Sequence, residues 1–175
     1  MEALKIVLFA TLAAVCYGIL HDQVTAHLCV EYFTIAHPPV FPTESPFWLA
    51  IGWGIIATWW VGLRLGVLLA VAARFGANRK LTLAELRRPI VFLMLFSGVM
   101  ALLSGSLGAV LVATGTLPVP NGWAEVIPPD KHVAFSADAW AHGASYASYA
   151  SGALGGLFVI GRTAWLRFRT ATAPA

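Results

Sequence analysis

Four long apolar stretches constrain this chain more than any other feature of its sequence. They cover residues 3–20, 47–65, 90–114 and 139–160, and each has the roughly 17 to 25 mainly apolar residues with which a helix crosses a lipid bilayer. Hydrophobic residues make up 59% of the chain and charged residues only 11%, a far more apolar composition than that of soluble domains. The sequence therefore predicts an all-α integral membrane protein, a single-domain bundle of four transmembrane helices.

The positions of arginine and lysine predict how this bundle is oriented. Most of these residues lie in the connection at 66–89 and in the C-terminal tail, whereas the connections at 21–46 and 115–138 carry only Lys131. Because cytoplasmic segments are enriched in arginine and lysine, both termini and the 66–89 connection are expected in the cytoplasm. The other two connections then lie on the outer, periplasmic-type side, and a bacterial inner (plasma) membrane is the expected location.

Short sequence patterns predict where helices begin and how they pack. Thr82 and Glu85 have the spacing of a capping box and predict a short cytoplasmic helix, with Pro89 at the start of the third span. Small residues recur four positions apart in every span, a pattern that lets helix backbones approach closely in lipid. These stripes are Ala10, Ala14 and Gly18; Gly54, Thr58, Gly62 and Gly66; Ser97, Ala101, Gly105 and Ala109; and Ala144, Ser148, Gly152 and Gly156. The sequence thus predicts a tightly packed bundle.

The histidines are all confined to one side of the predicted bundle. His21, His27, His37, His132 and His142 fall in or beside the outer connections, together with Asp22, Glu31, Glu44, Glu125, Asp130 and Asp138. Two pairs, His27 with Glu31 and Asp138 with His142, are four residues apart, so each pair would share one face of a helix. Imidazole and carboxylate together are ligands for transition metals. This partition predicts a polar cluster at the outer face.

Helix phase selects the central residues of that cluster. At about 100° per residue, His21 lies on the same face of the first span as Ala10 and Ala14, and so points into the bundle. On the fourth span Asp138, His142, Ser145 and Tyr149 form one polar stripe, which must face the interior because polar groups in lipid are costly. We therefore expect the rings of His21 and His142 to converge, with a carboxylate from Asp22, Glu31 or Asp138 within reach. His37 precedes Pro38 and is expected in extended chain.

Three functions fit this pattern. The first is a metal site for zinc, iron, manganese or copper, with ligands drawn from His21, Asp22, His27, Glu31, His132, Asp138 and His142, and with hydrolysis, oxidation or metal handling as its chemistry. The second is a b-type haem protein for electron transfer, with His21 and His142 as axial ligands. The third is a non-catalytic subunit or assembly factor of a larger membrane complex, or a homo-oligomer. A structural explanation also exists, in which the histidines form a polar network that holds the outer connections.

Several other classes lack support in the sequence. It contains no glycine-rich phosphate loop, nucleophile elbow or Cys-x-x-Cys motif. The basic residues form two blocks rather than a continuous patch, so no nucleic-acid partner is expected. Aromatic residues near the span ends, among them Tyr32 and Phe33, are explained by the interfacial belts of membrane proteins.

Overall fold

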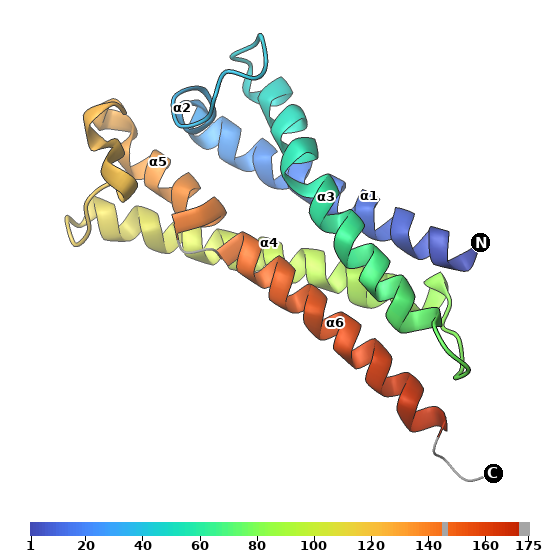
Figure 1. The fold of residues 1–175 in the computed structure, drawn as a ribbon. Coiled ribbons are helices and arrows are strands. Elements are labelled where there is room, and N and C mark those ends of the chain that lie inside the picture. Colours follow the sequence, from blue (N-terminus) through green and yellow to red (C-terminus); the bar gives the residue numbers. More distant parts are fainter. Residues whose placement is uncertain (145–146, 172–175) are drawn as a thin grey trace.

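A computed structural model describes residues 1–144 and 147–171, without the side chains of residues 121, 144, 147–149, 170 and 171. All regular secondary structure in the described part is helical (Figure 1). Its α-helices are α1 (Glu2–Leu28), α2 (Val30–Thr34), α3 (Pro46–Arg74), α4 (Leu83–Ala113), α5 (His132–Ala139) and α6 (Ala147–Ala171), and the shorter segments are η1 (Pro120–Glu125), η2 (Pro129–Lys131) and the π-helical η3 (Trp140–Ala144).

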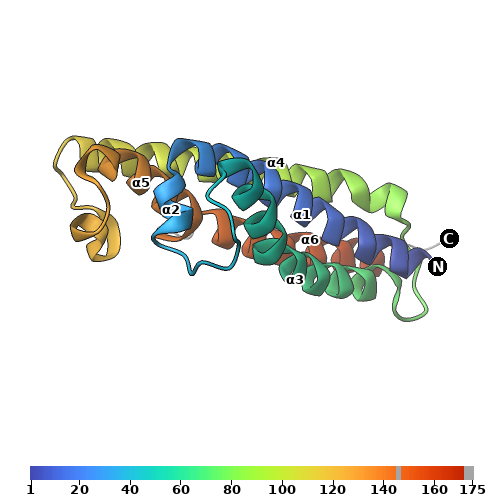
Figure 2. The same ribbon diagram turned by 90° about the horizontal axis from the view of Figure 1, so that it is seen from above.

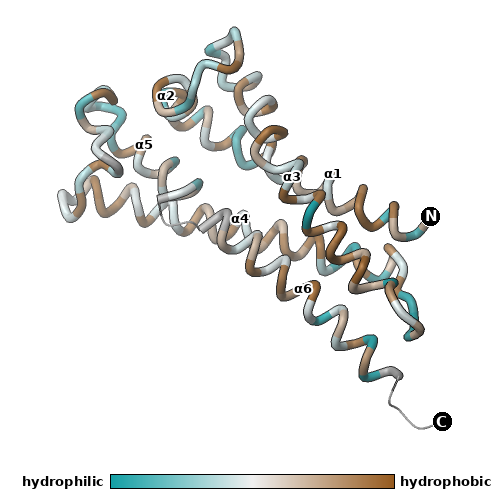
Figure 3. The backbone as a smooth tube through the Cα atoms, in the orientation of Figure 1, coloured by the Kyte–Doolittle hydropathy of each residue, from teal (hydrophilic) through white to brown (hydrophobic). Residues whose placement is uncertain are grey.

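Three of these helices, α1, α3 and α4, are long and apolar enough to cross a membrane. Figure 3 shows hydrophobic residues recurring along α1 and α3, with most hydrophilic residues in the connections and at the helix ends. The chain is therefore that of a helical membrane protein. The predicted fourth span is not among the three helices, so a bundle of four spans with both termini in the cytoplasm stays a prediction.

The helices form two groups that pack against each other. Helix α1 runs beside α3, while α4 runs beside α5 and α6 (Figures 1 and 2). The start of α1 and the end of α6 lie at one end of the molecule, and the connections from α1 to α3 and from α4 to α5 lie toward the other. The α1–α3 contact is very close: a Cβ atom added to Gly54 would lie 2.5 Å from the backbone nitrogen of Ile19. The small-residue stripes of these two helices therefore make the predicted contact.

Helix α4 differs from its predicted form. The capping box of Thr82 and Glu85 is present, but it opens α4 itself, so the prediction of a separate short helix before the third span is wrong. Pro89 lies inside α4, where it removes one backbone donor. The helix continues because Leu86 and Ile90 are buried with Ile6 in one apolar core cluster, and this burial outweighs one lost hydrogen bond.

The segment predicted as one helix over 139–160 is also different. Helix α5 ends at Ala139, η3 follows, and α6 runs from Ala147 to Ala171. Two glycines of α4 allow α5 and η3 to pack closely against this helix. A Cβ on Gly105 would lie 3.0 Å from the carbonyl oxygen of Ala137, and a Cβ on Gly108 would clash with the Trp140 ring. The π-helical turn changes the phase of the following residues, which periodicity alone does not reveal.

Candidate metal centre

Three side chains from two segments that are distant in sequence meet in the structure. His21 and Asp22 come from α1 and His142 comes from η3, and one ligand atom from each lies within 4.8 Å of the others. The ring centroids of the two histidines are 4.5 Å apart, with the planes inclined at 71°. The expected convergence of these two rings is therefore confirmed, with Asp22 as the carboxylate beside them.

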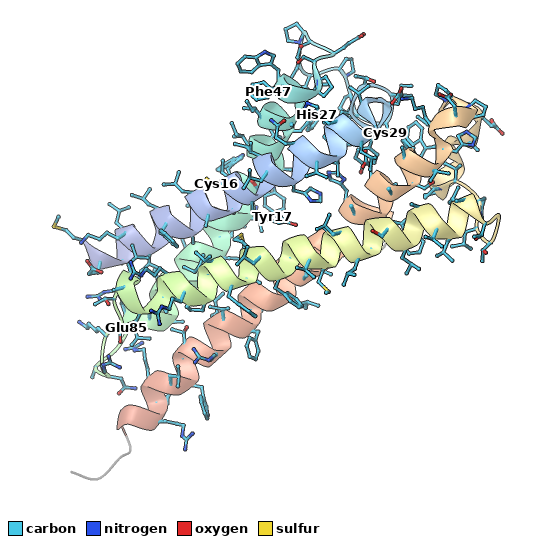
Figure 4. The ribbon with its side chains drawn as sticks, turned by 180° about the vertical axis from the view of Figure 1, so that it is seen from behind. Cys16, Tyr17, His27, Cys29, Phe47 and Glu85 are labelled. Carbon is cyan, nitrogen blue, oxygen red and sulfur yellow. The ribbon has the colours of Figure 1, made fainter. Side chains whose placement is uncertain are left out.

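The position of His21 follows from the phase of α1. Ala10, Ala14, Gly18 and His21 all line one cavity between the helices, as their spacing predicted. Tyr17, one turn before His21, projects from α1 toward α4 (Figure 4), and its ring stacks on that of His21 with centroids 5.7 Å apart. The Nε2 atom of His21 is buried and has no hydrogen-bond partner.

His142 has a polar partner at each of its two ring nitrogens. Its Nδ1 atom lies 2.9 Å from the main-chain oxygen of Asp138, and because a carbonyl can only accept, Nδ1 must carry a proton and donate it. Its Nε2 atom lies 3.1 Å from Oδ1 of Asp22, whose residue is only 4% exposed. The main chain thus fixes the orientation of the ring and directs Nε2 at a buried carboxylate.

Aromatic side chains of α2 cover the cluster. The Tyr32 ring stacks on His142 with centroids 4.8 Å apart, and Phe33 meets the same imidazole edge-on at 5.7 Å. His37 stacks on Phe33, and its Nδ1 lies 2.7 Å from the carbonyl oxygen of Tyr32; burial lowers the pKa of His37 below its usual range. The assignment of Tyr32 and Phe33 to an interfacial belt missed this contact with the cluster.

The fold-back that brings α2 here begins at Cys29. This residue is extended, with φ −148° and ψ 91°, and it ends α1 one residue before α2 starts. The interruption also explains why His27 and Glu31 do not share a helix face. The sequence signal that indicates a returning chain is the Pro38–Pro39 pair, which prevents α2 from continuing.

Three other predicted ligands lie away from the cluster. His27 is exposed at the end of α1 (Figure 4), with Nδ1 2.8 Å from the carbonyl oxygen of Gln23. Glu31 accepts a hydrogen bond from Cys29 and lies 3.7 Å from the Lys131 ammonium group. His132 contacts the carbonyl oxygen of Ile127 through Nε2 at 2.9 Å. The structure gives each of these side chains a local partner within the connections.

Asp138 is near the cluster without being one of its three members. Its main-chain oxygen positions His142, but its carboxyl group is fully buried and neither oxygen has a hydrogen-bond partner among the described residues. A buried carboxyl group without partners is costly. Ser145 and the side chain of Tyr149, which were predicted to continue the Asp138–His142 stripe, lie outside the described residues.

The cluster closes one end of an apolar cavity of about 110 Å³ that lies between α1, α3, α4 and α6. His21, Asp22 and His142 all line this cavity, whose other walls are mainly alanine, glycine and aliphatic side chains. The cluster is therefore both enclosed by α2 and open to an internal space. Comparison of the chain with protein-family models, curated proteins and solved structures gave no match.

Proposed function

We propose that this chain is a membrane metalloprotein that binds one divalent transition-metal ion through His21, Asp22 and His142. The observation that carries the proposal is the meeting of two imidazoles and one carboxylate from segments far apart in sequence, all with ligand atoms within 4.8 Å. In a tetrahedral zinc site with bonds of about 2.0 to 2.2 Å, the ligand atoms are about 3.3 to 3.6 Å apart. The 3.1 Å between His142 Nε2 and Asp22 Oδ1 is slightly shorter than that spacing, so a small separation of the two groups would admit the ion.

The proton on Nδ1 of His142 supports the presence of a cation between His142 and Asp22. Since Nδ1 donates to Asp138, the neutral imidazole presents the lone pair of Nε2 to the Asp22 carboxylate. Two electron pairs at this distance repel each other unless a proton or a metal ion lies between them. His21 adds a third ligand atom, a buried nitrogen with no hydrogen-bond partner among the described residues. A metal ion satisfies all three groups at once, whereas a shared proton satisfies only the His142–Asp22 pair.

Three protein ligands leave a coordination position free. Structural zinc sites are closed by four protein ligands, while catalytic sites keep one position for water or substrate. Here the three side chains face the apolar cavity, so the free position is directed into it. Two histidines and one carboxylate suit zinc, iron, manganese or copper, and the same combination binds non-haem iron in oxygenases.

The ring spacing favours a metal ion over haem. Axial imidazoles of a b-type haem lie on opposite faces of the macrocycle, with one iron–nitrogen bond of about 2 Å on each side. The His21 and His142 centroids are only 4.5 Å apart and their planes are steeply inclined, which leaves no space between them for a porphyrin.

Elemental analysis of the protein purified in mild detergent tests the proposal. We expect about one equivalent of a transition metal in the wild type, and background levels in His21→Ala, Asp22→Asn and His142→Ala. His27→Ala is the matched control, because His27 lies on the same helix but outside the cluster, and it should keep its metal. Full metal content in His142→Ala, or a haem absorption band in the wild type, would contradict the proposal.

A further inference from the structure

The buried polar atoms without hydrogen-bond partners are concentrated in one region. Among the described residues they are Nε2 of His21, Oγ of Ser97 and both carboxyl oxygens of Asp138. Native proteins leave few buried polar groups unpaired, and each one calls for an explanation. Ser97 lines one cavity, Asp138 lines a second cavity, and His21 lines both, so these groups lie along two adjoining spaces.

The first of these cavities, which lies between α1, α3, α4 and α6, is long and narrow, and we call it the channel. Its lining residues on α1 run from Ala10 to Asp22, a distance of about 18 Å at 1.5 Å per residue. Its volume is about 110 Å³, which holds only the first part of a long hydrocarbon chain. Long and narrow apolar space of this kind suits a single hydrocarbon chain better than a ring.

Gly152 shows that this space is real rather than a close helix contact. Among the atoms that the structure describes, a Cβ atom added there would have only one neighbour within 4 Å, the Ser97 Oγ at 3.8 Å. The prediction that Gly152 makes a tight contact is therefore wrong, since the residue lines the channel. By contrast, a Cβ on Gly156 would meet the Leu65 side chain at 2.7 Å.

The second cavity links the channel to the outside of the helices. It is a groove of about 750 Å³ between α1, α4 and α5, and Tyr17, His21 and Met94 line both spaces. The groove is also lined by Leu20 and Leu102, which are 68% and 61% exposed. In a membrane protein such side chains face lipid, so the groove gives access to His21 from the hydrocarbon phase.

We infer that the centre binds a single-chain lipid whose head group carries a hydroxyl and a carbonyl group. The hydrocarbon chain occupies the channel, the carbonyl accepts a hydrogen bond from Ser97, and the hydroxyl donates one to Asp138. His21, which lines both cavities, lies where the head group passes between them. The inference rests on the proposed metal centre, because the free coordination position faces the same channel.

Binding of tritiated 1-monolauroylglycerol to the protein in lipid nanodiscs tests the inference. We expect saturable binding of the labelled lipid. Because 1-dodecanol lacks the carbonyl group, it should compete about fivefold more weakly than unlabelled monolauroylglycerol, and dodecane should compete more weakly still. Gly152→Leu fills the channel and should weaken binding at least about tenfold, whereas Gly161→Leu, at a position with open space, should not. Gly152→Ala, which the fold accommodates, should give an intermediate loss.

Ser97→Ala provides the sharper test of head-group recognition. It should abolish the preference for monolauroylglycerol over dodecanol while leaving dodecanol binding unchanged. Metal content is measured on the same samples. A metal-loaded wild type that binds no lipid beyond empty nanodiscs, or equal binding by Gly152→Leu, would overturn the lipid site and leave the metal centre standing. Saturable binding sensitive to Gly152 in a protein without metal would support the lipid site and overturn the metal centre.

Discussion

Nε2 of His142 lies 3.1 Å from Oδ1 of Asp22, across 120 residues of sequence. The contact joins α1 to the π-helical segment η3, and it depends on a proton or cation between two groups that otherwise repel each other. Because Asp138 holds the opposite side of the imidazole, His142 cannot turn away from Asp22 without losing a main-chain hydrogen bond. The pair therefore supplies two fixed ligand atoms, a nitrogen and an oxygen, and His21 adds the third.

Metal addition should stabilise the folded protein through these three residues. A ligand that binds only the native state at 100 times its dissociation constant contributes about 2.7 kcal/mol. We expect the metal to raise the apparent melting temperature of metal-stripped wild-type protein in detergent, and to leave that of His142→Ala unchanged. His27→Ala should respond as the wild type does. An equal rise in all three proteins would mean that the metal acts elsewhere.

The contact between α1 and α3 should be intolerant of a single methyl group. In Gly54→Ala the new Cβ would lie 2.5 Å from the backbone nitrogen of Ile19, so the two helices must separate, at a cost of about 1–3 kcal/mol. Gly161→Ala is the matched control, because nothing lies within 4 Å of its new methyl group and alanine is the better helix former. Thermal unfolding in detergent compares the two. Equal stability of both variants would show that α1 and α3 are not in close contact.

Arg167 of α6 should hold the connection between α3 and α4. Its side chain is only 6% exposed, and its guanidinium group donates to the main-chain oxygens of Ala72, Phe75, Asn78 and Arg79. Since a hydrogen bond to a charged group contributes about 1.5–3 kcal/mol, Arg167→Ala should lower the free energy of unfolding by at least about 3 kcal/mol.

Two further variants make the Arg167 experiment specific. Arg167→Lys should restore little, because an ammonium group lacks the planar set of five donors. Arg88→Ala removes an exposed arginine and should change stability by less than about 0.5 kcal/mol. Unfolding of all variants is followed by circular dichroism in detergent. A wild-type melting curve for Arg167→Ala would show that the four hydrogen bonds do not stabilise the fold.

Periodicity predicted the part of the centre that lies on a regular helix. His21 could be placed because α1 is uninterrupted from Ala10 to His21, so a constant turn per residue gives its direction. The prediction that His27 and Glu31 share one helix face was wrong, because Cys29 breaks the helix between them. His142 was predicted to face inward, and it does, although it sits in a π-helical turn where the same phase rule does not hold.

The covering of the centre by α2 could not be predicted in the same way. Tyr32 and Phe33 stack on His142 only because the chain reverses after Cys29, and a local reversal of this kind leaves no periodic signal. The channel was hidden for another reason. A glycine stripe has the same sequence whether its residues touch a neighbouring helix, as at Gly54, or face empty space, as at Gly152. Only the relative positions of the helices distinguish the two.

The two cysteines should differ strongly in reactivity. Cys29 is buried and Cys16 is exposed, and burial raises the pKa of the Cys29 thiol to about 12. Only the thiolate reacts with alkylating agents. At pH 8 a thiol with that pKa is about 0.01% ionised, against about a quarter for an ordinary cysteine, and its thiolate fraction grows only as the pH approaches 12.

Alkylation of a Cys16→Ala variant isolates this behaviour. We expect iodoacetamide at pH 8 to modify Cys29 in the native protein at least about a thousandfold more slowly than in the denatured protein. Glu44→Cys in the same background adds an exposed thiol as the control and should react within minutes. Mass spectrometry counts the adducts. Rapid modification of Cys29 in the native state would show that its thiol is accessible to solvent.

We predict the membrane orientation from the end of the molecule that carries the basic residues. The connection between α3 and α4 contains Arg79 and Lys80 and lies at the same end as the start of α1 and the end of α6 (Figure 1), whereas the connection after α2 lies toward the opposite end and has no arginine or lysine. Basic segments are retained in the cytoplasm.

In the Cys16→Ala background, a membrane-impermeant maleimide should therefore label Glu44→Cys in intact bacterial cells and leave Ala77→Cys unlabelled until the cells are opened. Both positions are exposed in the fold, so the difference reports the membrane and not local burial. Labelling of Ala77→Cys in intact cells would reverse the orientation and place the metal centre nearer the cytoplasmic face.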